Sequence, residues 1–351
     1  MKSESVATTQ RLAGIEWMRG LAAFGVICIH SGLAVHNRTT TEAGFIRDDF
    51  DFVVPFFLTT SFFFAVQAER NGWVSWGNWM KRQGERILVP FVFWSTVYLA
   101  LHFAKLAVQR QGGEIAGLLA DPGGLVLSGG TSVALYFLPL LFMGLALIHL
   151  LSKLFREAPV YILAVGLIVS LGLHEACGRL GLVYDGGPVG AGSVPMAPLR
   201  LLVGLSEEGI RCAPLVFAVG ILHRYLPSPH NRKAGLFLGA GLVLLGPLHA
   251  VELPLSLMDP VRGLGGFLVG WGLSGLLAPS KIGTMVGLFS FGVYLIHHVF
   301  LEGLQMVFKP GVPIGVTGTL AISAGIYLAS MLAVGWASSG PAVVRRVLGL
   351  R

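Results

Sequence analysis

The stretch EWMRGLAAFGVICIHSGLAVH, from Glu16 to His36, decides the fold class of this chain. After its first turn it is almost entirely apolar, and a helix needs about 20 such residues to cross the hydrocarbon core of a membrane. Similar runs recur along the chain, at 51–69, 86–107, 132–152, 158–175, 208–224, 234–251, 260–278, 283–304 and 315–337. Because lipid offers the backbone no hydrogen bonds, these runs predict an all-α bundle of about ten transmembrane helices.

The composition agrees with a polytopic membrane protein. Hydrophobic residues make up 54% and charged residues 12%, and a soluble chain of 351 residues needs more charge to cover its surface. Its 48 glycines are typical of membrane helices that approach one another closely. The net charge of +7 is scattered between the apolar runs, so we expect no nucleic-acid partner. The three cysteines lack paired spacing and predict neither a metal site nor a disulfide framework.

The distribution of lysine and arginine predicts the orientation. With both ends inside (N-in/C-in), most basic residues and few acidic ones fall on the cytoplasmic side, as the positive-inside rule requires. We expect one domain over 1–351 in the inner (cytoplasmic) membrane, with a bundle at 15–337 between cytoplasmic tails at 1–14 and 338–351. The first run has no small-residue cleavage site and is predicted to be retained.

Two stretches carry no clear prediction. The Gly/Pro-rich stretch 178–206 has apolar pieces that can hide a re-entrant segment. The stretch 115–127 is similar in composition and too short to cross a membrane.

Arg19 and His30 are ionisable residues inside the first apolar run, where such groups are costly and often functional. Their separation of eleven positions gives roughly 16 Å along a helix and nearly the same face. One interpretation is a polar shaft, in which Arg19 holds an anion near the cytoplasm and His30 does proton chemistry in mid-membrane. The other is a snorkelling arginine and a core histidine bonded to a carbonyl group. The pattern alone leaves both open.

His297, in the ninth run, lies at the same depth from the start of its run as His30 does in the first. The two imidazoles can therefore line one cavity. Ser290 and Tyr294 share the helix face of His297, although Tyr294 is alternatively a packing aromatic. The adjacent His298 points about 100° away, and we expect it to be a bystander.

The loop before the third run ends in KRQGERILVP, residues 81–90. On a helix Arg82 and Arg86 are i, i+4 neighbours that can grip phosphate groups together. The alternative is a topology signal, which basic clusters beside membrane spans usually are. The sequence has no Walker A loop, no GxGxxG after a strand, no HExxH and no GxSxG. ATP-driven transport, dinucleotide binding and zinc proteolysis therefore have no support.

Acidic residues and one histidine gather in the loops predicted to lie outside. They are Asp48, Asp49, Asp51, His174, Glu175, Glu207 and Glu208. Some can bind a substrate that carries hydroxyl groups, but we expect most of them to be solvated loop residues.

Four segments, in this order, resemble the integral-membrane acyltransferase-3 family. They are GIEWMRGLAAFGVICIH at 14–30, VPFFLTTSFFFAV at 54–66, KRQGERILVPFVFW at 81–94 and SFGVYLIHHVF at 290–300, with a weaker match in LYFLPLLF at 135–142. The matching positions with polar side chains are Arg19, His30, Ser61, Arg82, Arg86, Ser290, Tyr294 and His297. The chain departs from the family at Glu16, where Asp is usual, and at Gln83, where a second Arg is usual.

The resemblance implies an O-acyltransferase that moves an acyl group, often acetyl, from cytoplasmic acyl-CoA to a hydroxyl of a carbohydrate. It implies that His30 is the general base. Arg19, Arg82 and Arg86 would hold the donor, with Glu16 orienting Arg19. The other cavity residues that it implies are Ser61, Tyr136, Ser290, Tyr294 and His297. Acyl-CoA is then a substrate, and we expect no permanently bound cofactor and no metal.

The family's fused extracytoplasmic esterase-like domain is not found in this sequence, so the membrane domain is expected to complete the transfer. Cell-surface polysaccharide, lipid-linked oligosaccharide, a peptidoglycan sugar and a small secreted glycoside are all open as acceptors. Direct transfer and a covalent acyl group on His30 are also both open.

Two other classes of function compete with the enzyme. A secondary transporter or flippase for a glycan or small anion also needs arginine and histidine inside the membrane. A structural partner in a polysaccharide machine would tolerate substitution of Arg19 and His30. The ordered family segments favour the enzyme, because a transporter has no reason to carry them.

Overall fold

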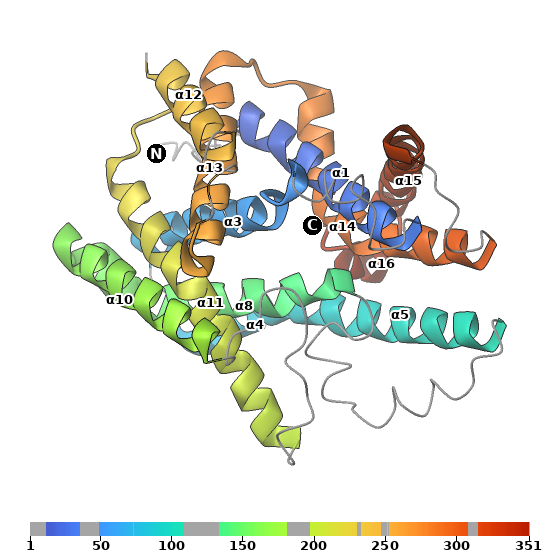
Figure 1. The fold of residues 1–351 in the computed structure, drawn as a ribbon, viewed down its shortest axis with the longest axis horizontal. Coiled ribbons are helices and arrows are strands. Elements are labelled where there is room, and N and C mark those ends of the chain that lie inside the picture. The colour runs from blue at the N-terminus through green and yellow to red at the C-terminus, as the bar shows by residue number, and fades with distance from the viewer. Residues whose placement is uncertain are drawn as a thin grey trace, which may run out of the picture.

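The computed structural model describes residues 12–35, 49–72, 74–108, 133–180, 197–229, 233–246, 251, 253–307 and 315–350. Every regular element within these ranges is helical (Figure 1). The helices are α1 (Ala13–Val35), α3 (Val53–Asn71), α4 (Trp76–Gln83), α5 (Val89–Val108), α8 (Phe137–Leu150), α9 (Ser152–Glu157), α10 (Val160–Arg179), α11 (Ala197–Tyr225), α12 (Ala234–Leu245), α13 (Leu255–Leu276), α14 (Lys281–Val307), α15 (Gly315–Ser338) and α16 (Ala342–Val347). A π-helical turn, η1 (Gly84–Leu88), joins α4 to α5, and a 3₁₀ turn, η2 (Val133–Tyr136), precedes α8.

The all-α membrane architecture predicted from the apolar runs is present. Each run lies largely on a helix, as bilayer burial demands. Four helical stretches in the described part of the chain are long and apolar enough to cross a membrane, namely Trp76–Val108, Val160–Arg179, Lys281–Leu304 and Gly315–Ser338. The chain is therefore an all-helical membrane protein.

The two stretches without a clear prediction are only partly described. Residues 178–180 end α10, and residues 197–206 form the first turns of α11. Residues 181–196 and 115–127 lie outside the described residues, as do residues 1–11 of the predicted N-terminal tail.

Helix α1 occupies the middle of the bundle and packs against α3, α13, α14 and α15 (Figure 1). Glycines allow this close packing. A Cβ atom added at Gly14 would collide with the backbone of α13, and one added at Gly20 would collide with Val286 of α14. The backbone N–H of Ile15 donates to Ser274 Oγ at 3.2 Å, which satisfies a donor of the first helical turn. These contacts fix the position of α1, and hence of its ionisable residues, relative to α14.

The last described residues fold back onto the bundle, where α16 packs against α5 and α15. The N–H groups of Gly349 and Leu350 donate to carbonyls of the preceding turn at 3.0 and 2.8 Å, and Gly349 has φ +65°. This is a Schellman cap, whose left-handed residue favours glycine. Leu348 and Leu350 are buried, and the indole N–H of Trp94 on α5 donates to the Val347 carbonyl at 2.8 Å. The segment predicted as a C-terminal tail is thus docked in a defined position.

Candidate active site

Three histidine rings meet in the interior between α1 and α14. The ring centroid of His30 lies 5.5 Å from that of His297 and 4.9 Å from that of His298. One nitrogen from each ring lies within 4.8 Å of the others. The prediction that His298 points away from the other two histidines is wrong, because its ring meets that of His30. His30 faces the groove between the two neighbouring side chains and therefore contacts both, even though these diverge by about 100°. We call these three residues the histidine cluster.

His297 is oriented by its own helix. Its Nδ1 lies 2.7 Å from the carbonyl oxygen of Tyr294, one turn earlier. Because a carbonyl oxygen only accepts, Nδ1 carries the hydrogen and Nε2 carries the lone pair. His297 is fully buried, and its Nε2 has no hydrogen-bond partner among the described residues. Such a nitrogen can accept or relay a proton. Three imidazoles are also a donor set that zinc accepts, so the cluster has two possible chemical uses.

Helix α5 closes the histidine cluster on another side. The ring of Tyr98 lies 5.8 Å from that of His298, and its hydroxyl donates to the carbonyl of Leu295. Further along α5, the Lys105 ammonium lies 2.7 Å from the Glu302 carboxylate of α14, and both side chains are only 14% exposed. Sequence reasoning missed these three side chains. The available signal was a pair of opposite charges near the ends of two apolar runs.

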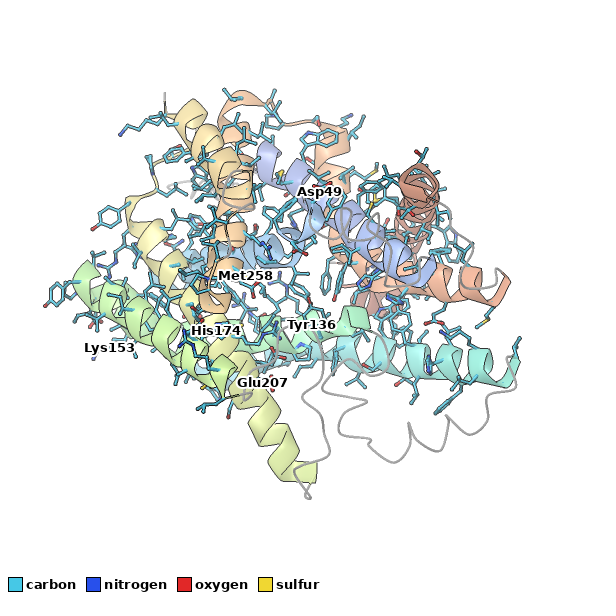
Figure 2. The ribbon with its side chains drawn as sticks, in the orientation of Figure 1. Asp49, Tyr136, Lys153, His174, Glu207 and Met258 are labelled. Atoms are coloured by element: carbon cyan, nitrogen blue, oxygen red, sulfur yellow. The ribbon has the colours of Figure 1, made fainter. Side chains whose placement is uncertain are left out.

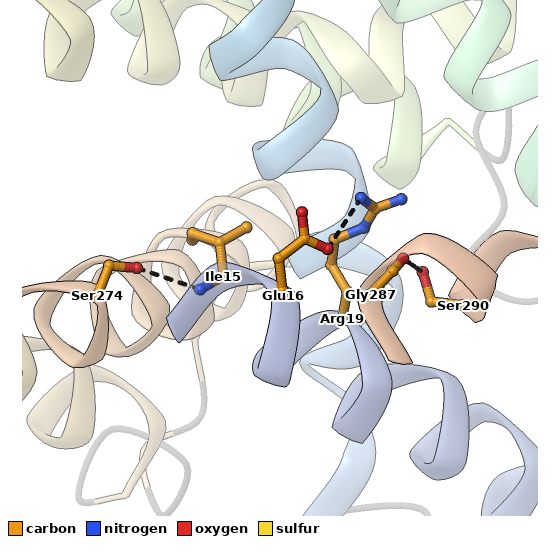
Figure 3. Close-up of polar contacts among 6 residues, drawn as sticks. All are labelled: Ile15, Glu16, Arg19, Ser274, Gly287 and Ser290. Carbon is orange, nitrogen blue, oxygen red and sulfur yellow. Dashed lines mark hydrogen bonds and ion pairs between the residues drawn. The ribbon is translucent and has the colours of Figure 1, made fainter. Parts of the chain in front are cut away.

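At the other end of α1, Glu16 and Arg19 form an ion pair with a separation of 3.7 Å (Figure 3). The Glu16 carboxylate lies against Gly287 of α14, where any Cβ atom would overlap it. Ser290 donates to the Gly287 carbonyl at 2.7 Å, so this hydroxyl is used within its own helix (Figure 3). Because α1 is continuous from Ala13 to Val35, Arg19 lies roughly 16 Å along the helix from His30.

Tyr294 belongs to an aromatic wall beside the histidine cluster. Its buried ring lies 6.0 Å from that of His297, 5.4 Å from that of Phe137 and 6.3 Å from that of Phe291, on which it stacks. Tyr136 directly precedes Phe137 at the start of α8 (Figure 2). The structure therefore brings the predicted positions Tyr136 and Tyr294 into one region. It does not do so for Ser61, which is half-buried on α3 and has no hydrogen bond or ring contact with the cluster among the described residues.

A basic cleft of about 390 Å³ opens where η1 meets α16. It is lined by Arg82, Glu85, Arg86, Ala342, Arg345, Arg346, Gly349 and Leu350. The structure thus places the predicted pair Arg82 and Arg86 together, and it adds two arginines that the sequence analysis treated only as part of a tail. The π-helical turn that carries Arg86 is a local irregularity of a kind found often at functional sites.

The basic cleft and the histidine cluster are connected by two elements. Gly349 of the cleft lies against Phe291, the ring that stacks on Tyr294. Along η1 and α5, twelve positions separate Arg86 from Tyr98, which corresponds to roughly 18 Å along a helix. The cleft therefore lies next to the aromatic wall that borders the histidine cluster.

Asp48 lies outside the described residues, and the outer acids that the structure describes do not form one site. Asp49 lies well apart from Glu207 and His174 in Figure 2. Asp51 pairs with Arg262 at 3.2 Å, and Glu208 pairs with Arg211 at 3.6 Å. His174, expected to be a solvated loop residue, is instead buried on α10. These residues give no cluster comparable to the three histidines.

One further polar pair lies inside the bundle. Glu69 of α3 accepts from His149 of α8 at 2.8 Å, and the rings of Trp76 and Trp79 lie 5.5 and 5.0 Å from the imidazole. This pair joins α3 and α8 to α4, the helix that leads into the basic cleft. Sequence reasoning missed it, because neither residue belongs to a motif.

Comparison with known proteins gives one match. A family model described as an acyltransferase domain matches residues 12–339, which is nearly all of the chain. No curated protein and no solved structure matches.

Proposed function

The chain belongs to the acyltransferase-3 family, and on this premise we propose that it moves an acyl group, in the simplest case acetyl, from cytoplasmic acyl-CoA to a hydroxyl of a cell-surface or lipid-linked glycan. The family match makes the chain a membrane acyltransferase. The donor, the acceptor and the roles of individual residues belong to the proposal. The observation that carries it is the meeting of His30 with two further imidazoles in the interior, in a protein that also presents a cleft lined by four arginines.

The proposed topology has about ten spans with both ends in the cytoplasm of a cell whose inner membrane holds the protein. It is supported by the excess of lysine and arginine on one side and by the helix found at every apolar run. In this orientation Arg19, Arg82 and Arg86 face the compartment that contains acyl-CoA.

The donor would bind from that side. Acyl-CoA carries its phosphate groups at one end and its thioester at the other, joined by a flexible pantetheine arm. Arg82 and Arg86 would hold the phosphates, and Arg19, kept in place by Glu16, would supply positive charge at the start of α1. The arm would then run past Tyr294 and bring the thioester to His30.

The transfer itself requires a base. The lone pair of a neutral His30 would take the proton of the acceptor hydroxyl while the oxygen bonds to the thioester carbonyl carbon. When the carbon–sulfur bond breaks, the sulfur leaves with the electron pair and takes the same proton from the imidazolium. The products are an ester and free CoA thiol, and His30 returns to its starting form. His297 would hold the reacting groups through Nε2, since its Nδ1 is occupied by the Tyr294 carbonyl.

A covalent route fits the same geometry. His30 would attack the thioester first, release CoA and pass the acyl group on to the hydroxyl. A burst of free CoA in the absence of acceptor would indicate this route, and strict dependence of CoA release on the acceptor would indicate direct transfer. In both routes Ser61, Tyr136 and Ser290 are proposed only as residues of the surrounding cavity.

A transporter or flippase is the second candidate, and one observation favours it. The buried ion pair between Lys105 and Glu302 is of a kind that transporters use to couple movement to protons or ions. A transporter would move a glycan or small anion across the membrane without forming a new ester.

The test measures transfer of a labelled acetyl group to carbohydrate. Wild-type protein and His30→Ala are reconstituted with acetyl-CoA labelled in the acetyl group and an extract of surface glycan from the host. We expect label on carbohydrate with the wild type and none with the variant. Equal labelling by both would remove His30 from the mechanism, and uptake of glycan into vesicles without labelling would favour the transporter.

A further inference from the structure

The basic cleft combines two parts of the chain that are far apart in sequence. Arg82 comes from the last turn of α4 and Arg86 from η1, and Arg345 and Arg346 come from α16. We propose that Arg345 and Arg346 are donor-binding residues, which complete with Arg82 and Arg86 a site for the phosphate groups of acyl-CoA. This inference rests on the proposed function, and it deepens that function by assigning a role to the C-terminal helix.

The charge of the cleft favours an anion. Four guanidinium groups line it, and Glu85 is the only carboxylate among its lining residues. All four arginines are exposed at the rim of a cavity of about 390 Å³. Four like charges around one hollow repel each other, and a bound anion with several charges relieves that repulsion. Guanidinium groups bind phosphate with two parallel hydrogen bonds each, and CoA offers a pyrophosphate and a separate ribose phosphate.

Helix α16 makes specific contacts with the bundle that a topology signal does not require. A topology signal requires only positive charge near the membrane. Here Leu348 and Leu350 are buried, the Trp94 indole donates to the Val347 carbonyl, and Gly349 takes a left-handed conformation against Phe291. These contacts hold the backbone that carries the two arginines in place before any ligand arrives, which lowers part of the entropic cost of binding.

The position of the basic cleft relative to the histidine cluster also fits the shape of acyl-CoA. Phe291, which contacts Gly349 of the cleft, stacks on Tyr294, and Tyr294 lies beside His297. An anion bound between η1 and α16 therefore has its far end directed toward the histidine cluster. An anionic lipid headgroup offers the same phosphate chemistry, but it has no thin polar arm to extend into the bundle.

The experiment compares Arg345→Ala/Arg346→Ala with the wild type, both as full-length protein in nanodiscs of phosphatidylcholine. The matched control is Lys153→Ala/Arg156→Ala, which removes the same charge from α9, outside the residues that line the cleft. Two readouts are used. They are the Kd for CoA by titration calorimetry, and the KM for acetyl-CoA and for acetyl-pantetheine, a donor without the nucleotide and its phosphates.

We expect Kd for CoA and KM for acetyl-CoA to rise about tenfold or more in the cleft variant, since each tenfold change corresponds to the loss of one good charged contact. The KM for acetyl-pantetheine and all values for the control should stay unchanged. Weaker CoA binding by the variant, together with no acyl transfer by the wild type, would uphold the site and refute the proposed reaction. Unchanged CoA binding in an active enzyme would overturn the inference and leave the proposed function intact.

A separate experiment tests whether the cleft binds an anionic lipid headgroup instead of CoA. The same proteins are placed in nanodiscs that contain labelled phosphatidylglycerol, and the bound lipid is measured after exchange into phosphatidylcholine. Loss of retained phosphatidylglycerol in the cleft variant, with CoA binding unchanged, would assign the cleft to lipid and overturn our proposal.

Discussion

The histidine cluster and the basic cleft are built in opposite ways. The cluster lies in the interior, and its rings come from long helices, α1 and α14, whose relative position is fixed by glycine contacts. The cleft lies at the surface, and its arginines come from the end of α4, the π-helical turn that follows it, and the short helix α16, which ends in a Schellman cap. The first has few charges and close packing, and the second has many charges and an open cavity.

In the proposed reaction, this difference separates proton transfer, which takes place in the histidine cluster, from binding of the anionic end of the donor, which takes place in the basic cleft. Proton transfer needs an imidazole in a fixed position and away from water. Holding a polyanion needs several cations within reach of the cytoplasm, where phosphate groups are already solvated. Changes in the cluster should therefore lower kcat, and changes in the cleft should raise KM for the donor.

The largest effect is expected for substitutions in the cluster. His30→Gln should lower kcat roughly 10²- to 10⁴-fold, the usual contribution of a positioned general base, with little change in KM for acetyl-CoA. His297→Gln should also act on kcat, because its Nε2 faces the same region while its Nδ1 is bonded to Tyr294. The measurement is steady-state release of CoA in the presence of acceptor.

The matched control for this pair is His174→Gln, which changes a buried histidine on α10, a different helix. It should retain most of the wild-type kcat. A loss of kcat as large as that of His30→Gln would mean that any buried histidine is needed for folding, and the contrast between cluster and cleft would disappear.

A smaller effect is expected from disturbing the contact that aligns α1 with α14. In Gly287→Ala the new methyl group would overlap the Glu16 carboxylate. Overpacking of this kind typically costs about 1–3 kcal/mol, so the melting temperature in detergent should fall and kcat should decline. The control is Gly303→Ala on the same helix, where an added Cβ meets nothing within 4 Å.

The double variant Glu16→Ala/Gly287→Ala sharpens this test. Removing the carboxylate relieves the closest overlap but leaves the Cβ of residue 16 at 2.8 Å from the new methyl group, so the melting temperature should recover part of the way while the partner of Arg19 is lost. No recovery would show that the Glu16 carboxylate is not what makes Gly287 necessary.

How much of this the sequence could predict differs between the two regions. The helices and the shared depth of His30 and His297 follow from the lengths of the apolar runs and the helical repeat. The contact of His298 does not, because it depends on how α1 is rotated against α14, which Gly20 and Gly287 determine in three dimensions.

The sequence predicted the part of the cleft that contains Arg82 and Arg86, but not the part formed by α16. Arg82 and Arg86 are close in sequence, and their proximity follows from local helical geometry. Their meeting with α16 depends on long-range contacts such as that of Trp94 with Val347, 253 positions away. A local signal did exist, since RRVLGL ends in a glycine between two leucines, the pattern of a helix C-cap with an apolar contact. It predicts a helix end but not its partner.

A modest effect is expected from salt. Raising the ionic strength from about 0.01 M to 0.15 M shortens the screening length from about 30 Å to about 8 Å, which weakens attraction between exposed arginines and phosphates. The KM for acetyl-CoA should rise severalfold, while kcat at saturating donor should stay constant because the histidine cluster lies between helices, with His297 fully buried and His30 and His298 only partly exposed. An equal fall in kcat would place exposed charges in the chemical step. The KM for acetyl-pantetheine, which lacks the phosphates, serves as the control.

The smallest expected effect is that of metal removal, and it decides between the two uses of the histidine cluster. If His30 is the base, its lone pair must be free for a proton, and the same lone pair cannot bind zinc. Prolonged treatment with EDTA should therefore leave kcat unchanged, and the purified protein should contain no stoichiometric zinc by mass spectrometry of the metal. Loss of activity on chelation, with recovery on addition of zinc and a lower metal content in His30→Gln, would assign the cluster to a metal centre. The role proposed for the basic cleft would not change in that case, because its arginines are proposed to bind the other end of the donor.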